Sequence, residues 1–337
     1  MNEPGRIGAL LASPFWNRDE RRLRALWRLV GFAVVAGVLS RIALAAGLVQ
    51  RGHGGLVLFE VAMRLVLTML PLWITARLLE RRPLSDSGLR LDRAFPRELG
   101  MGLALGALLM SGIFGVEKAL GWVGVKGVLH AADPARPFAL AFLTPLIVFV
   151  CVGIYEEALF RGFLMRTLGE GFSSRFVPPR AALVLACVVS SALFGLGHRN
   201  NPEATAVSTL NIAVAGVFLA LPYLLTTRLA LSIGLHITWN LFQGSVYGFP
   251  VSGNTGLTTT IVAIEQRGPI VWTGGAFGPE AGLLGLVAMG AGSIAIFLCL
   301  RDAQGRAQVQ EALAAPPVRP APLPPAPPPA EPDQLPA

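Results

Sequence analysis

Three groups of polar side chains interrupt apolar stretches of the sequence, and their residue types are those that hydrolytic enzymes use. The patterns are Glu156-Glu157-x-x-x-Arg161, Phe194-x-x-x-His198 and His236-x-x-x-Asn240. An ionisable side chain at the centre of a membrane helix costs about 2.5–3.5 kcal/mol on insertion scales, so those retained there are candidates for function. We therefore predict one functional site assembled from these three segments.

The spacing within each pattern assigns different tasks to its residues. Side chains four positions apart share one face of a helix. We therefore expect Glu157 and Arg161 to form an ion pair, with Glu156 turned away from it and free to act as a base. His198 can share the activation of a water molecule with that carboxylate. Such a set hydrolyses an amide without a serine or cysteine nucleophile.

The third pattern supplies hydrogen-bond donors. His236 and Asn240 lie on one helical face and can donate to a developing oxyanion, a contribution of about 3–4 kcal/mol per donor in other enzymes. A metal site is the alternative, because Glu156, His198 and His236 could ligate zinc with water in the fourth position. The H-E-x-x-H pattern of many zinc proteases is missing from the sequence.

Composition places these residues in a membrane. The chain has 337 residues, of which 53% are hydrophobic and 14% charged, and its mean hydropathy is +0.59. These values predict an all-α, polytopic membrane bundle rather than a water-soluble domain. A spanning helix needs about 20 apolar residues. We predict eight spans, at residues 29–49, 56–79, 99–120, 138–165, 181–198, 205–226, 229–246 and 281–300.

Charge distribution predicts the topology. The net charge of +8 comes from arginines concentrated in the N-terminal segment and in alternate connections between the spans. This is the positive-inside pattern, so both termini are expected in the cytoplasm of a bacterial inner membrane, and nucleic acid is not an expected partner. The domain boundaries follow: a basic cytoplasmic leader at 1–28, the bundle at 29–300, and a disordered, Pro/Ala-rich cytoplasmic tail at 301–337.

Straight helices raise a conflict about the two histidines. His198 would lie about 25 Å from the inner surface and His236 roughly 10 Å from it, at 1.5 Å per residue. They can meet only if helices tilt, break or begin elsewhere than predicted. The long outer connection, residues 247–280, could cap the bundle.

The runs EEALFRGFLM, SALFGLGH and GLHITWN together resemble the signature motifs of the CAAX protease and bacteriocin-processing family, the CPBP or Abi intramembrane proteases that include type II CAAX prenyl endopeptidases. The resemblance covers about residues 99–248. It implies that Glu156 and His198 activate the hydrolytic water, that His236 and Asn240 form the oxyanion hole, and that Glu157, Arg161 and Phe194 support the site. It also implies about eight spans and favours a reaction that needs no metal cofactor.

Two other classes of function remain open on the sequence. A non-proteolytic membrane scaffold or bacteriocin-immunity protein would bind a partner without needing Glu156 and both histidines. A small-solute transporter would show paired discontinuous helices in two halves, and no such repeat is visible. The favoured interpretation is an intramembrane endopeptidase acting on a peptide or a membrane-anchored protein. Glu60 and Arg64 are expected to form a separate, structural ion pair.

Overall fold

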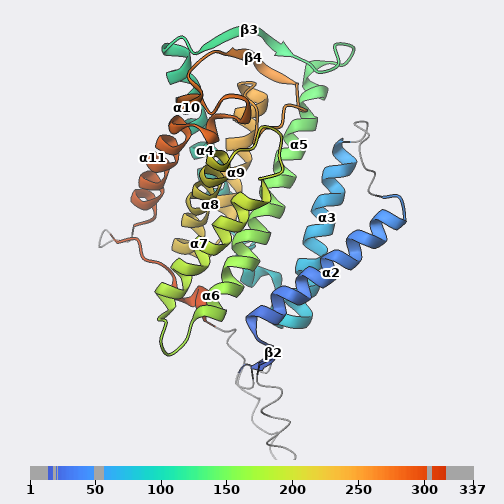
Figure 1. The fold of residues 1–337 in the computed structure, drawn as a ribbon, viewed down its shortest axis with the longest axis vertical. Helices are drawn as coiled ribbons and strands as arrows, with labels where there is room; N and C mark the ends of the chain where they lie inside the picture. Colours follow the sequence, from blue (N-terminus) through green and yellow to red (C-terminus); the bar gives the residue numbers. More distant parts are fainter. Residues whose placement is uncertain (1–13, 18–19, 21, 49–56, 302–305, 316–337) are drawn as a thin grey trace, which may run out of the picture.

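The computed structural model describes residues 14–17, 20, 22–48, 57–301 and 306–315. Within them the chain forms a tall bundle of helices, with a small sheet across one end (Figure 1). The long helices are α2 (Ala25–Ala45), α3 (Val57–Thr75), α4 (Phe95–Ala119), α5 (Phe138–Glu157), α7 (Pro179–Gly197), α8 (Ala206–Thr226) and α11 (Leu283–Leu300). Shorter helices are α6 (Arg166–Phe172), α9 (Ala230–Leu241) and α10 (Ile270–Thr273).

Seven helices in the described part of the chain are long and apolar enough to cross a membrane. The predicted all-α membrane bundle is therefore confirmed. Two of these seven helices continue as π-helix. Helix α3 continues through η1 (Ala76–Glu80). Helix α5 continues through η3 (Ala158–Met165) into α6, so that α5, η3 and α6 form one continuous rod of 35 residues from Phe138 to Phe172. At 1.5 Å per residue this rod is about 50 Å long, longer than a bilayer core.

The seventh predicted span, residues 229–246, differs from the prediction. It forms the 12-residue helix α9, followed by a π-turn η4 (Phe242–Val246), and nearly all of α9 is buried by other helices. Glycines permit this burial: a Cβ on Gly102 of α4 would lie 2.1 Å from Leu231 O, and one on Gly234 of α9 would lie 2.3 Å from Leu99 O. Small residues let membrane helices approach closely. The helix with both His236 and Asn240 is thus a core element.

The position of α9 removes most of the conflict between the two histidines. Leu183 and Cys187, in the second and third turns of α7, pack in one buried cluster with Leu229 and Ile233 at the start of α9. Helix α9 therefore begins deeper in the bundle than α7, by roughly 10 Å at 1.5 Å per residue. The straight-helix estimate was wrong because it started both helices at one level.

A cap covers the upper end of the bundle in Figure 1. Strand β3 (Val123–His130) pairs antiparallel with β4 (Thr260–Gln266), with Val125 opposite Ile264. The predicted cap, residues 247–280, contains β4, α10 and the 3-10 turns η5 (Gly275–Phe277) and η6 (Pro279–Ala281). The sheet itself was not predicted, because its two strands lie in connections between the apolar runs that were assigned as spans.

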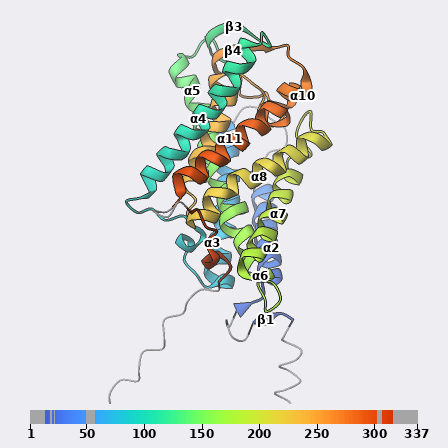
Figure 2. The same ribbon diagram turned by 90° about the vertical axis from the view of Figure 1, so that its left-hand side faces the viewer.

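The lower end holds both described ends of the chain (Figure 2). Strands β1 (Trp16–Asn17) and β2 (Arg22–Leu23) form a hairpin before α2, and η2 (Leu84–Ser87) lies in the connection between α3 and α4. Arg22 and Arg28 of the predicted leader are buried, where they pair with Glu170 of α6. The basic leader is therefore partly a packed element.

The predicted tail also differs from the structure over residues 306–315. The 3-10 turn η7 (Glu311–Ala314) packs against α6 and α7, Leu313 is fully buried, and Gln310 N–H donates to Leu224 O at 2.8 Å. The apolar side chains of Val309, Leu313 and Ala314 explain this packing, and they were overlooked beside the proline-rich sequence that follows. Residues 316–337 lie outside the described residues.

Candidate active site

Glu157 is the buried centre of the site. It ends α5, and its Oε1 accepts hydrogen bonds from Arg161 Nη1 at 2.9 Å and from His236 Nδ1 at 2.8 Å. Arg161 Nη2 donates in turn to the backbone oxygen of Gly216 in α8 at 2.9 Å. The predicted Glu157–Arg161 ion pair is present, and it joins three helices, α5, α8 and α9.

Glu156 takes the other direction, as its position next to Glu157 on a helix predicts. Its side chain is 16% exposed, against 0% for Glu157, and Glu156 Oε2 accepts no hydrogen bond from the described residues. That oxygen lies 3.8 Å from His236 Nε2. Two polar atoms at this separation can both contact one water molecule at hydrogen-bond distance.

The partners of the two histidines set their tautomers. His236 Nδ1 lies 2.8 Å from the Glu157 carboxylate and His198 Nδ1 lies 2.8 Å from the backbone oxygen of Phe194. Because both partners only accept hydrogen bonds, each Nδ1 carries the proton. The Nε2 atom of a neutral ring is then a base, and it donates only when the ring carries a second proton.

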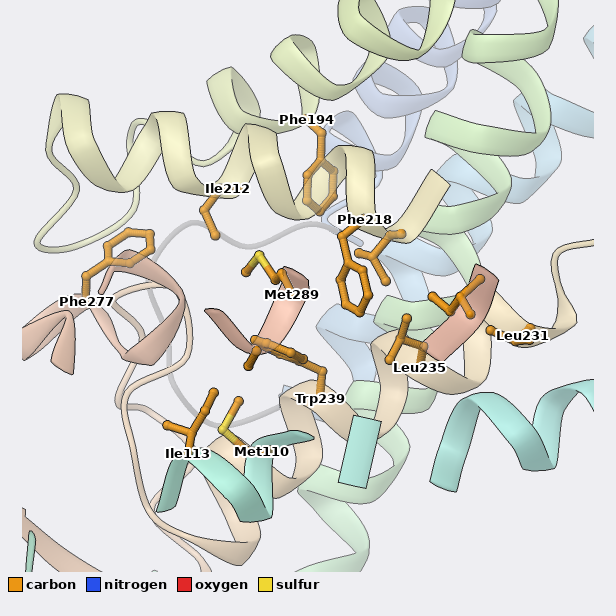
Figure 3. Packing of buried hydrophobic residues seen from close by; sticks show 13 residues of the cluster. Met110, Ile113, Phe194, Ile212, Phe218, Leu231, Leu235, Trp239, Phe277 and Met289 are labelled. Carbon is orange, nitrogen blue, oxygen red and sulfur yellow. The ribbon is translucent and has the colours of Figure 1, made fainter. Parts of the chain in front are cut away.

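Phe194 lies between the charged groups and the histidines. The Arg161 guanidinium stands over its ring at 4.6 Å, and its ring centroid is 4.8 Å from that of His198 and 6.2 Å from that of His236. Phe194 belongs to the apolar cluster that includes Phe218, Trp239 and Met289 (Figure 3). This ring therefore positions both imidazoles from a fixed part of the core.

One cavity of about 930 Å³ collects the predicted catalytic residues. Glu156, His198, His236 and Asn240 all line it, together with Phe194. Glu157 and Arg161 lie behind this wall. The geometry brings together every predicted site residue, although the separate roles assigned to them stay predictions.

A family model described as "Type II CAAX prenyl endopeptidase Rce1-like" matches residues 138–242, the stretch that holds all seven of the predicted site residues. This stretch of the chain is therefore similar to the CAAX prenyl endopeptidases. No curated protein and no solved structure matches the chain. The family match agrees with the resemblance drawn from the three motifs.

Local backbone features of the candidate active site explain how its residues meet. Gly153 of α5 packs against α9, where a Cβ would lie 2.6 Å from Ile237 Cγ1. This close approach carries Glu157, one turn further on, to His236. The helix then changes to π-helix at Ala158, a form that often occurs at functional sites.

The zinc alternative depends on whether three ligands converge. Among the described residues, no group of three or more His, Cys, Asp or Glu side chains is placed to hold a metal ion. Two of the predicted ligand atoms, Glu156 Oε2 and His236 Nε2, lie 3.8 Å apart.

Several residues of the cavity were missed by sequence reasoning. Glu280 of η6 lines the same cavity and is buried, and burial raises its pKa to about 7 against hydrogen bonds from Ser252 and Gln243 that lower it. A single carboxylate in a Gly-rich loop gives no periodic signal that could have found it. Glu60 and Arg64 also line the cavity, and in the described structure they form no ion pair with each other, so that structural prediction was wrong.

Proposed function

We propose that this protein is an endopeptidase that cuts a peptide bond within the membrane by water that Glu156 and His198 activate. The observation that carries the proposal is the shared cavity, which Glu156 lines with an oxygen that has no described hydrogen-bond donor, while Glu157 stays outside the cavity lining and its Oε1 accepts from Arg161 and His236. The difference between neighbouring carboxylates supports one as base and the other as scaffold.

The hydrolytic step follows from the orientation of these groups. A water bound at Glu156 loses its proton to the carboxylate as its oxygen attacks the substrate carbonyl carbon. His198 presents Nε2 toward the same cavity, because its Nδ1–H is committed to Phe194 O. The proton taken from water then passes to the leaving amine as the C–N bond breaks.

The oxyanion needs donors on another wall. The Asn240 side-chain amide supplies N–H groups without any change of protonation. His236 donates from Nε2 when its ring is doubly protonated, a form that Glu157 and Glu156 on either side of the ring support electrostatically. Such preorganised donors are effective in a site that excludes bulk water.

The setting proposed is a bacterial inner membrane with the lower end of the bundle in the cytoplasm. Arginines 22, 24, 28, 81, 82 and 228 lie at that end, which fits the positive-inside rule. The substrate proposed is a peptide or a membrane-anchored protein, because apolar groups such as Val61 and Val152 line the cavity beside the polar ones. The reaction proposed needs no metal, since a free carboxylate is available as base.

Cleavage of a membrane-tethered peptide library tests this mechanism. We expect purified wild type to cleave, with or without a chelator, and Glu156→Gln, His198→Ala and His236→Ala each to lose activity. Loss on chelation with recovery on adding zinc would replace the metal-free mechanism with a metalloenzyme. Equal cleavage by wild type and Glu156→Gln would refute proteolysis through this site and return attention to a scaffold or immunity protein.

A further inference from the structure

Glu280 connects parts of the chain that are far apart in sequence. Its Oε1 accepts from the Ser252 N–H at 2.5 Å and from Ser252 Oγ at 3.1 Å, while its Oε2 accepts from Gln243 Nε2. The residue is 3% exposed, so water screens these bonds little. The carboxylate thus links two segments: the end of α9, through Gln243, and a loop of the cap, through Ser252.

The first of these segments is the end of α9. Gln243 lies three residues after Asn240, in the π-turn η4, and its Nε2 also donates to Pro250 O at 2.6 Å. The Gln243 side chain therefore anchors the C-terminal end of the helix that carries His236 and Asn240. An anchor at this point controls how α9 is rotated and how far it extends.

The second segment leads back to His198. Ser252 O accepts from Asn201 Nδ2 at 2.9 Å, and the Asn201 N–H donates to His198 O at 3.0 Å. His198 is the C-cap residue that follows the last residue of α7, so no further helical turn holds its carbonyl group. The hydrogen bonds through Ser252 and Asn201 supply that restraint.

The packing around Glu280 leaves little freedom. Gly278 has φ of +120°, and a Cβ there would lie 2.3 Å from Pro250 O and 2.7 Å from Glu280 Oε2. A Cβ on Gly253 would lie 1.7 Å from Pro202 O. Both glycines allow the backbone segments around Glu280 to approach more closely than a residue with a Cβ would permit.

We propose that Glu280 is a positioning residue, which fixes His198 relative to His236 and Asn240 through Ser252 and Asn201 on one side and Gln243 on the other. Its catalytic consequence rests on the proposed endopeptidase function. A carboxylate is required because all its neighbours are donors. Glutamine at 280 would turn an NH₂ group toward either Gln243 Nε2 or the Ser252 N–H, and one bond of the bridge would be lost.

The test compares Glu280→Gln with a matched control, Glu117→Gln. Glu117 is likewise fully buried near the cap and accepts from a glutamine, Gln266 Nε2 at 2.8 Å, but it joins α4 to β4 and does not line the cavity. We expect Glu280→Gln to lower kcat by about 10- to 100-fold with KM changed less than about twofold, as small displacements of catalytic groups do. Glu117→Gln should keep the wild-type kcat.

A double variant separates the bridge from general stability. Glu280→Gln with Gln243→Glu restores the hydrogen bond between positions 280 and 243, because the glutamine at 280 can donate there and still accept from Ser252. The bond from position 243 to Pro250 O is lost in this variant, so we expect it to recover part of the kcat that Glu280→Gln loses. If Glu280→Gln does not fold, Asn201→Ala cuts the same path and should lower kcat, again with KM little changed.

Hydrogen–deuterium exchange reads the bridge without any cleavage. Exchange in residues 198–205 and 243–253 should rise in Glu280→Gln and stay at wild-type levels in Glu117→Gln. If wild type cleaves no peptide, the endopeptidase function fails and the exchange result alone decides the bridge. Unchanged exchange in both segments, a wild-type kcat in Glu280→Gln, or an equal fall of kcat in Glu117→Gln would overturn the proposal.

Discussion

Two buried clusters of charge lie at different heights in this bundle and treat their carboxylates in opposite ways. In the lower cluster Glu170 accepts from Arg22 and Arg28 at 2.8 and 2.9 Å through Oε2, and from Arg82 at 2.6 Å through Oε1. In the candidate active site Glu157 Oε1 accepts from Arg161 and His236, but Glu157 Oε2 and Glu156 Oε2 have no described donor. Both oxygens of Glu170 thus accept hydrogen bonds, whereas each carboxylate of the site keeps one oxygen that does not.

The difference teaches how to distinguish a structural ion cluster from a reactive one in apolar surroundings. Removing one partner from a buried ion pair is strongly destabilising, so the paired charges of the lower cluster hold α2, η1 and α6 together. An unsaturated carboxylate beside a cavity contributes less to stability and retains a lone pair for chemistry. Burial alone does not separate the two; an unbonded carboxylate oxygen on a residue that lines a cavity does.

The sharpest test of this contrast is Glu156→Gln. We expect the cleavage rate to fall by about 10² to 10⁴, the usual contribution of a general base, while the thermal unfolding midpoint stays near that of wild type. Peptide cleavage and melting in detergent measure the two quantities. A large loss of stability would mean that Glu156 has a structural role like that of Glu170.

Glu170→Gln should show the reverse. With this charge removed, Arg22, Arg28 and Arg82 lose their shared partner and keep only Glu20 and Glu80, so we expect the free energy of unfolding to fall by about 3 kcal/mol. Denaturant titration measures this fall, and activity per folded molecule should be retained. If activity is lost while stability is unchanged, the two clusters are coupled and the comparison breaks down.

Gly153→Ala tests the packing of α5 against α9, which brings Glu157 to His236. The new Cβ would lie 2.6 Å from Ile237 Cγ1. We expect the free energy of unfolding to fall by about 1–3 kcal/mol and cleavage to slow, because α5 is pushed away from His236. Gly290→Ala in α11 is the control, since nothing lies within 4 Å of a Cβ there. Equal effects of the two substitutions would show that helix approach at Gly153 is unimportant.

The smallest effect is expected at an exposed pair. Asp92 accepts two hydrogen bonds from Arg228, which lower its pKa from 3.8 to about 2. The stability it contributes is therefore present above about pH 3.8 and is lost as pH falls through about 2. Asp92→Asn should lower the unfolding midpoint slightly, and equally at pH 7 and pH 4.5. A difference that is already smaller at pH 4.5 would indicate an ordinary carboxylate.

Most of the helices could be predicted from the sequence because hydrocarbon demands long apolar runs. The predicted spans 56–79 and 205–226 agree with the observed helices to within a residue or two. Helix α9 could not be judged in the same way, since an apolar run of its length has the same composition whether lipid or protein surrounds it. The close packing of α9 against Gly102 of α4 shows that protein surrounds it, and this packing can be seen only in the folded structure.

The candidate site was predictable in part for a related reason. The i,i+4 rule predicted that Glu157 pairs with Arg161 and that Glu156 points in another direction, because both relations are local to one helix. The bond between His236 and Glu157 joins residues 79 positions apart, and local spacing could not reveal it. Glu280 was invisible for the same reason, as its partners come from α9 and from a loop.

The short, enclosed α9 also bears on how the protein is made. Its 12 residues are too few to cross a bilayer alone, and its polar residues Ser232, His236 and Asn240 make it a poor substrate for stepwise insertion by a translocon. We expect α9 to reach its place only after α4, α5 and α8 have assembled around it. In a newly inserted chain the contact between His236 and Glu157 would then form only when the bundle closes around α9, so that the candidate site is completed at the end of biogenesis.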